Sequence, residues 1–281
     1  MTLPGESSES SASAPAAEPY FTLDGDVFHP NDPSRGPWNR ETLAGRAISG
    51  ILGYAVEQRH GDDGFVPARL TVDMFRVAPY RPMEVTTRVV REAGRIKVVD
   101  AELICEGLTV ARASCQFLRK TENPQAKIWG PPGWTATKPE DLPEPVLPPG
   151  APEALRAIRM ISGQMFMAVQ RRAWMREVRD FTQTAPLTPF MRAALAADFA
   201  SPFSNHGDAG LEFINTDVTL YLHRAPEGAW LGMEVVDHNA AAGVSVGSCR
   251  LYDAQGPIGT CTAAALAQRG LAKPPQPTNK S

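Results

Sequence analysis

Thr188-Pro-Phe-Met-Arg-Ala-Ala-Leu-Ala-Ala-Asp-Phe-Ala-Ser201 is the stretch that decides the fold. We expect one short helix here, because Thr188 is suited to cap the free amides of the first turn and Pro189 needs no amide hydrogen bond there. The stretch is almost entirely apolar, which is typical of a buried helix. Its one acid, Asp198, shares a face with Leu195 and Met191. A carboxylate on such a face is unfavourable unless it is paired or used, so Asp198 is the first candidate for catalysis; an acid that merely ends the helix is the alternative.

The composition describes a globular chain without a membrane or nucleic-acid signature. Its 281 residues fit one large or two small domains, 43% are apolar, and 28 basic and 31 acidic residues give a net charge of −3. We therefore expect no nucleic-acid partner. The sequence contains no apolar run of about 18 residues, so we expect no membrane span. Residues 1–19 have no apolar secretory core, which predicts a disordered leader and a cytoplasmic protein.

The cysteines and histidines show no metal-binding pattern. Cys105, Cys115, Cys249 and Cys261 lie in strand-like segments without a CxxC pair, so we expect reduced, buried thiols. The histidines have no ligand spacing either. We expect neither a metal nor a cofactor.

The order of patterns predicts two α+β units. Residues 20–120 contain an Asp24-Gly25 hairpin turn, a glycine-containing helix at about 40–57, and strands at 66–77, 83–91, 96–105 and 108–118. A proline-rich stretch, 121–155, predicts an interdomain linker. Residues 156–270 contain strand-like segments at 165–169 and 173–178, the helix, a loop at 202–210, and strands at 211–223, 230–237, 243–252 and 257–267. Residues 271–281 predict a disordered tail.

The second unit repeats the first at a shift of 148 residues. Leu70-Thr-Val-Asp-Met-Phe-Arg76-Val-Ala-Pro79 aligns with Val218-Thr-Leu-Tyr-Leu-His-Arg224-Ala-Pro226, with apolar residues at matching positions. Each unit then consists of an antiparallel sheet wrapped round a central helix. Two such units in tandem can pair their sheets edge to edge and place both helices on one face. At this shift Asp198 falls on Gly50, which predicts one site per pair of units.

The duplicated pattern, Ala197-Asp198-Phe199 and the run from Asn215 to Arg224 resemble the acyl-CoA thioesterase II family, the double-hotdog thioesterases. The resemblance covers most of residues 35–268. It implies that a helix Asp, a Thr or Ser on the next strand and a Gln on the last strand hold the water that attacks the thioester carbonyl.

Carrying those roles over residue by residue gives a partial match. The Asp is Asp198, and the strand residue falls on Asn215, with Thr216 as the alternative one residue later. Ala263 stands where the Gln is expected, and Thr262 or Gln268 would need a shifted register to replace it. The helix N-terminus of the first unit falls on Ala44-Gly45-Arg46, whose amides are suited to the carbonyl oxygen; Arg46 is alternatively a contact for a CoA phosphate. His206 is a further candidate for lining the substrate site.

The expected function is hydrolysis of a fatty-acyl thioester by water that Asp198 activates, with acyl-CoA or an acyl-carrier thioester as substrate. Because of Ala263, the alternative is a weak or inactive acyl-CoA-binding hotdog protein. An enoyl-CoA hydratase or dehydratase is a third hypothesis. Exposed sheet edges predict a homodimer or a larger homo-oligomer.

Overall fold

The computed structural model describes residues 17–130, 134–144 and 156–272. Most of the expected leader and tail, and residues 131–133 and 145–155 of the expected linker, lie outside the described residues. The elements follow in the order β1 (Phe21–Asp24), β2 (Val27–Pro30), η1 (Asp32–Ser34), α1 (Gly45–His60), β3 (Phe65–Met74), β4 (Met83–Ala93), β5 (Ile96–Cys105), β6 (Leu108–Arg119), η2 (Pro139–Asp141), β7 (Arg156–Ser162), β8 (Arg172–Glu177), α2 (Pro189–Ala197), α3 (Ala200–Asn205), β9 (His206–Gly207), β10 (Gly210–Asn215), β11 (Asp217–Leu222), β12 (Leu231–Ala241), β13 (Val244–Asp253) and β14 (Gly256–Ala272).

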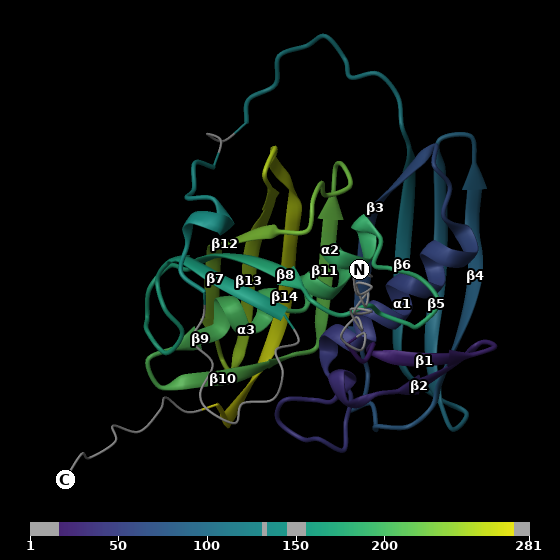
Figure 1. The fold of residues 1–281 in the computed structure, drawn as a ribbon, viewed down its shortest axis with the longest axis horizontal. Coiled ribbons are helices and arrows are strands. Elements are labelled where there is room, and N and C mark those ends of the chain that lie inside the picture. The colour runs from purple at the N-terminus through teal and green to yellow at the C-terminus, as the bar shows by residue number, and fades with distance from the viewer. Residues whose placement is uncertain (1–16, 131–133, 145–155, 273–281) are drawn as a thin grey trace, which may run out of the picture.

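The described strands form one 14-stranded sheet in the order β1-β2-β4-β5-β6-β3-β11-β14-β13-β12-β8-β7, with β10 paired to β14 and β9. The strand pairs within it are antiparallel. Figure 1 shows the two halves side by side, with β3 and β11 where they meet. This arrangement is the double hotdog of an α+β protein, with the two half-sheets joined into one.

The junction explains the repeat seen in the sequence. Strands β3 and β11 are the two repeated strands, and they pair so that Thr71 lies opposite Thr219, its equivalent at a shift of 148. The Thr219 hydroxyl donates to the Thr71 hydroxyl at 3.2 Å. Leu70 faces Leu220 and Val72 faces Val218. An approximate two-fold axis therefore passes between the two threonines, and it relates the two halves.

Helices α1 and α2 pack against each other on the inner face of this sheet. A Cβ added to Gly53 would lie 3.1 Å from the Ala194 Cβ, and one added to Gly50 would lie 2.8 Å from Leu195 Cδ2. The glycines inside α1 thus allow a close approach of α2, which balances their unfavourable helix propensity. The close approach also brings the C-terminal end of α2 to the first turn of α1.

The helix expected over 188–201 is instead two helices. Helix α2 ends at Ala197 and α3 begins at Ala200, and the Phe199 amide bonds three residues back, to Ala196 O at 3.0 Å. Pro202 has no amide hydrogen for the Asp198 carbonyl, so the regular ladder is interrupted here. Asp198 therefore lies at the C-cap of α2. The loop expected at 202–210 contains the rest of α3.

The strand expected at 165–169 was also wrong. The chain forms β7 at Arg156–Ser162, and residues 165–169 are turn and bend. Gly163 and Phe166 have φ angles of 71° and 61°, in the left-handed region that ends strands. The apolar run therefore belongs to a turn between β7 and β8.

Trp134 and Thr137 of the expected linker contact the C-terminal half, whereas residues 121–130 are exposed. The Trp134 ring lies 5.0 Å from the Trp174 ring and 4.2 Å from the Tyr252 ring, between centroids. The Trp174 indole donates to Thr137 O at 2.9 Å. An indole can bury a large apolar surface, and the Trp134 indole holds the segment against the sheet.

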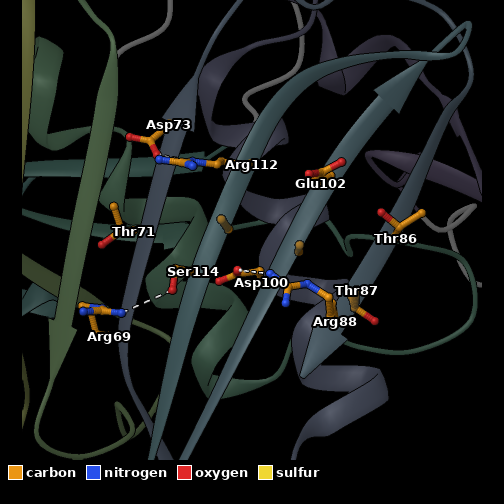
Figure 2. A pocket seen from close by; sticks show the side chains of 12 residues that line it. Arg69, Thr71, Asp73, Thr86, Thr87, Arg88, Asp100, Glu102, Arg112 and Ser114 are labelled. Atoms are coloured by element: carbon orange, nitrogen blue, oxygen red, sulfur yellow. Dashed lines mark hydrogen bonds and ion pairs between the residues drawn. The ribbon is translucent and has the colours of Figure 1, made fainter. Parts of the chain in front are cut away.

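The outer face of the N-terminal half-sheet is polar and carries a hollow of about 670 Å³. Figure 2 shows Arg112 reaching Asp73 and Arg88 reaching Asp100; the closest N–O distances are 2.8 and 3.2 Å. Alternation along each strand sends these side chains away from the helices. This hollow is thus on the opposite side of the sheet from Asp198.

The remaining expectations concern cysteines, metals and membrane spans. The four cysteines are free and buried. Among the described residues no group of three or more His, Cys, Asp or Glu side chains is placed to hold a metal ion. None of the helices described has the length and apolar character needed to cross a bilayer.

Candidate active site

Asp198 meets the N-terminus of α1. A Cβ added to Gly45, the first residue of α1, would lie 2.4 Å from Asp198 Oδ1 and 2.9 Å from its Cγ. These separations are below any normal contact, so the carboxylate occupies the space that a side chain at position 45 would need. The glycine therefore lets an acid from one half of the protein touch the helix of the other half.

The carboxylate takes the place of a helix cap. Ala44, at the N-cap of α1, has no side-chain acceptor for the first amides, and the backbone amide of Arg46 donates to Asp198. On the other side, Asn215 Nδ2 donates to Asp198 Oδ1 at 2.9 Å. The positive end of the helix dipole favours the ionised acid in this position. The acid is thus oriented by one amide from each half.

The environment of Asp198 makes it more basic than an exposed carboxylate. Burial raises the pKa of the Asp198 carboxyl, and the Asn215 hydrogen bond and the positive charges of Arg156 and Arg46 partly offset that rise. The ionised acid has about four acceptor positions, of which the two amides use two. Asp198 is therefore able to accept a further hydrogen bond from water and then a proton.

Two buried arginines surround this acid. The Arg46 side chain, 6% exposed, lies 3.6 Å from Glu177 Oε1 and over the Tyr20 ring. Tyr20 donates its hydroxyl to Glu177 Oε2 at 2.8 Å. Arg156 stacks on Phe199, with 4.2 Å between the guanidinium carbon and the ring centroid, and burial lowers the pKa of Arg156 to about 10. Each cation thus has a carboxylate nearby, which is the condition for burying charge.

The predicted site residues are only partly brought together. Asp198, Asn215, Gly45 and the Arg46 amide converge, whereas the Arg46 side chain turns inward to Glu177 instead of outward to solvent. The Thr216 hydroxyl donates to Ala264 O at 3.4 Å, so the geometry favours Asn215 over Thr216 as the partner of Asp198.

His206 lies apart from this group. Its Nδ1 is 2.9 Å from Pro202 O, and its ring meets Phe166 edge-on at 4.9 Å. Arg171 donates to the His206 carbonyl at 2.8 Å, which holds the end of α3. We find no contact between His206 and Asp198 in the described structure, and the substrate role predicted for this histidine stays a prediction.

In the described part of the chain, no glutamine pairs with Asn215 across β10 and β14. Ala265 pairs with Asn215 across β10 and β14, and the buried Ala263 lies on the same face of β14. Thr262 bonds the Ser248 hydroxyl at 2.9 Å on the other face, and Gln268 is exposed. Helix α3 fills the space instead, since a Cβ on Gly247, opposite Ala263, would lie 2.0 Å from Ser204 Oγ.

Sequence reasoning missed a second acid at the other end of the helix pair. Thr188 Oγ1 donates to Glu57 Oε2 at 2.6 Å, so Glu57 of α1 lies at the start of α2 much as Asp198 lies at the start of α1. Burial raises the pKa of Glu57, which the Thr188 bond partly offsets. Glu57 would have been found from the antiparallel pairing of the two helices. A constant shift of 148 residues aligns the helices in the same direction and so does not bring Glu57 to Thr188.

Comparison with known families now decides the relationship. The family model described as the acyl-CoA thioesterase N-terminal domain matches residues 34–118, and the one described as the C-terminal domain matches residues 131–267. The chain belongs to the acyl-CoA thioesterase family. No curated protein matches it.

Solved structures similar to this acyl-CoA thioesterase family member share its fold over nearly the whole chain. A conserved hot dog protein of unknown function from Alicyclobacillus acidocaldarius is 19% identical, with a TM-score of 0.70 over 89% of this chain and 96% of that one. The tesB protein of Mycobacterium avium subspecies paratuberculosis is 15% identical, with a TM-score of 0.64 over 89% and 93%. An acyl-CoA thioesterase II, TesB2, from Mycobacterium marinum is 14% identical, with a TM-score of 0.59 over 90% and 95%.

Proposed function

We propose that this member of the acyl-CoA thioesterase family hydrolyses a fatty-acyl thioester, and that Asp198 is the base that activates water. The observation that carries the proposal is the enclosure of the Asp198 carboxylate between Gly45, the Arg46 amide and Asn215. Both halves contribute to this enclosure, in agreement with one site per pair of hotdogs.

The proposed reaction uses groups already in place. A water bonded to Asp198 attacks the thioester carbonyl carbon while Asp198 takes its proton. Negative charge develops on the carbonyl oxygen, and the Gly45 amide at the start of α1 is the donor that we assign to it, because the Arg46 amide donates to Asp198 and the Ala47 amide to Ala44 O. Collapse of the tetrahedral intermediate breaks the C–S bond, and the proton that Asp198 took passes to the leaving thiolate, which returns Asp198 to its ionised form. Asn215 holds Asp198 through its amide during these steps.

Two matched variants test this role. Asp198→Asn keeps the shape of the side chain but removes the base, and we expect thiol release from a panel of acyl-CoAs to fall roughly 10²–10⁴-fold, the usual contribution of a positioned base. Glu57→Gln neutralises a different partly buried acid, the one bonded to Thr188 at the far end of the helix pair, and should leave turnover unchanged. If Asp198→Asn retains full turnover, the assignment of the base is wrong and Asp198 only caps α1.

A second candidate function is binding without hydrolysis, and Ala263 is the observation that favours it. A water with one fewer side-chain ligand is less well oriented, and poor orientation is costly in rate. This candidate predicts that the wild-type protein binds acyl-CoA, measured by calorimetry, and releases no free thiol. Measurable thiol release that Asp198→Asn removes would exclude it.

A further inference from the structure

The charged side chains beside Asp198 are incompletely paired. Arg46 Nη1 lies 3.6 Å from Glu177 Oε1, which is beyond hydrogen-bond length, and both Nη atoms of Arg46 are buried without a hydrogen-bond partner. Glu177 accepts instead from the Tyr20 hydroxyl at 2.8 Å. The Arg46–Glu177 contact is thus an ion pair only, and Glu177 has no further charge to balance a second cation.

Arg156 is that second cation. It lies opposite Glu177 across β7 and β8, and its guanidinium carbon is 4.2 Å from the ring centroid of Phe199, the residue that follows Asp198. No hydrogen bond or ion pair joins the Arg156 guanidinium to another described residue, and part of Arg156 stays accessible at the start of the edge strand β7. A cation without a partner of its own is therefore held next to the candidate base.

The charges of this group decide what kind of anion it can take. Arg46 and Arg156 carry two positive charges. Glu177 and the ionised Asp198 carry two negative charges, and Tyr20 is neutral because burial raises the pKa of its hydroxyl. A carboxylate on the substrate would add a third negative charge in a largely buried place, where an unbalanced charge is costly. The charge on the thioester oxygen is different, because it forms as Asp198 takes a proton and becomes neutral.

The position of Arg156 also suits the thioester oxygen. That oxygen must lie near Asp198, because the water that Asp198 activates attacks the carbon next to it. The cation that attracts the ionised carboxylate will therefore attract the oxyanion as well. The Gly45 amide is one donor for this oxygen, and the Arg156 guanidinium has several more. A positive charge fixed before the reaction begins needs little reorganisation when the oxyanion forms.

We propose that Arg156 is a further catalytic residue, whose guanidinium donates to the thioester oxygen as negative charge develops there. The water proton passes to Asp198, the new C–O bond forms, and the electron pair of the C=O bond moves to the oxygen beside Arg156. When the C–S bond breaks, that pair returns to the carbonyl and the proton passes from Asp198 to the thiolate. This inference rests on the proposed function for the reaction itself.

The test uses Arg156→Gln, which removes the charge, and Arg156→Lys, which keeps it. Arg176→Gln is the matched control, because Arg176 is an exposed arginine on the neighbouring strand β8 and lies over the Trp230 ring. Thiol release from acyl-CoA and from the same acyl group on N-acetylcysteamine gives kcat and KM across a range of pH. Binding of a thioether analogue of acyl-CoA, measured by calorimetry, and thermal unfolding report on structure without reaction.

We expect Arg156→Gln to lower kcat roughly 10²–10³-fold, the usual cost of removing one oxyanion donor, with KM and thioether binding nearly unchanged. The loss should be the same for both thioesters. It should persist on the plateau above the acidic limb, where Asp198 is ionised in variant and wild type alike. Arg156→Lys should recover part of the rate because the positive charge remains, and Arg176→Gln should behave as the wild type.

Four results would overturn the proposal. A loss that disappears on the plateau would mean that Arg156 acts only on the pKa of Asp198. A loss confined to acyl-CoA would assign Arg156 to the coenzyme instead. Equal loss in Arg156→Gln and Arg156→Lys, with weaker thioether binding and a lower melting temperature, would make its role structural. Full turnover of Arg156→Gln beside an inactive Asp198→Asn would remove this inference and leave the proposed function standing, whereas a wild type that releases no thiol would remove both.

Discussion

Gly45→Ala should abolish most of the activity without unfolding the protein. The new Cβ would lie 2.4 Å from Asp198 Oδ1, 2.9 Å from Cγ and 3.0 Å from Oδ2. Carbon and oxygen in ordinary contact are well over 3 Å apart, so the carboxylate must move by about 1 Å. The bond from Asn215, now 2.9 Å, would then exceed hydrogen-bond length.

A displacement of this size has a predictable effect on rate. Misplacing a catalytic group by about 1 Å is expected to lower kcat by roughly 10²-fold. Alanine is the better helix former by about 1 kcal/mol, which offsets part of the strain, so the melting temperature should change little. The side chain that must move is a short one at a helix end, whereas the two helix backbones stay in place.

The assay is thiol release from acyl-CoA at saturating substrate, with thermal unfolding followed by circular dichroism. Gly94→Ala is the matched control, because a Cβ there meets no atom within 4 Å. Full activity of a folded Gly45→Ala protein would show that the position of Asp198 against α1 does not matter for turnover. The reasoning from the Gly45–Asp198 contact would then be refuted.

Three further predictions follow from the same contacts. The free energy of unfolding of Asp198→Asn minus that of the wild type should increase as pH rises above about 4. The pKa of Asp198 is raised in the folded state, which therefore binds an extra proton in this pH range, so wild-type stability falls with pH until both states are ionised, whereas the variant has no such group. Denaturant titrations at pH 4 and 7 measure this gap, and a gap that narrows at pH 7 would contradict it. Arg156→Gln removes a cation that lowers the pKa of Asp198, so the acidic limb of the kcat/KM profile should move to higher pH; an unmoved limb would show that Arg156 does not act on this acid. Gly50→Ala should destabilise the protein by about 1–3 kcal/mol in urea titrations, because its Cβ would lie 2.5 Å from Phe181 and 2.8 Å from Leu195, and a neutral effect would mean that the helices can separate at no cost.

Local pattern was enough to predict the units of the fold. Period-two alternation indicated the strand at 66–77, and the strand expected at 96–105 is β5, which begins and ends at those residues. The repeat at 148 residues predicted edge-to-edge pairing, and Thr71 opposite Thr219 confirms it. Both depend on spacing along the chain, which a sequence displays directly.

The sequence predicted individual residues of the site but not the contacts between them. Asp198 was identifiable because an acid on an apolar helix face is unusual, and Gly45 because the family resemblance pointed to that helix start. The break of the helix at Asp198, the inward turn of the Arg46 side chain and the pairing of Glu57 with Thr188 were not foreseen.

Those features depend on which helix end meets which, and that is decided by the two-fold relation between the halves. Two antiparallel helices bring the C-terminal end of one to the N-terminal end of the other, so residues about 150 positions apart share a hydrogen bond. Linear spacing reports neighbours within a strand or helix. Only the packed structure decides which amide an acid accepts from, because burial and helix dipoles act through space.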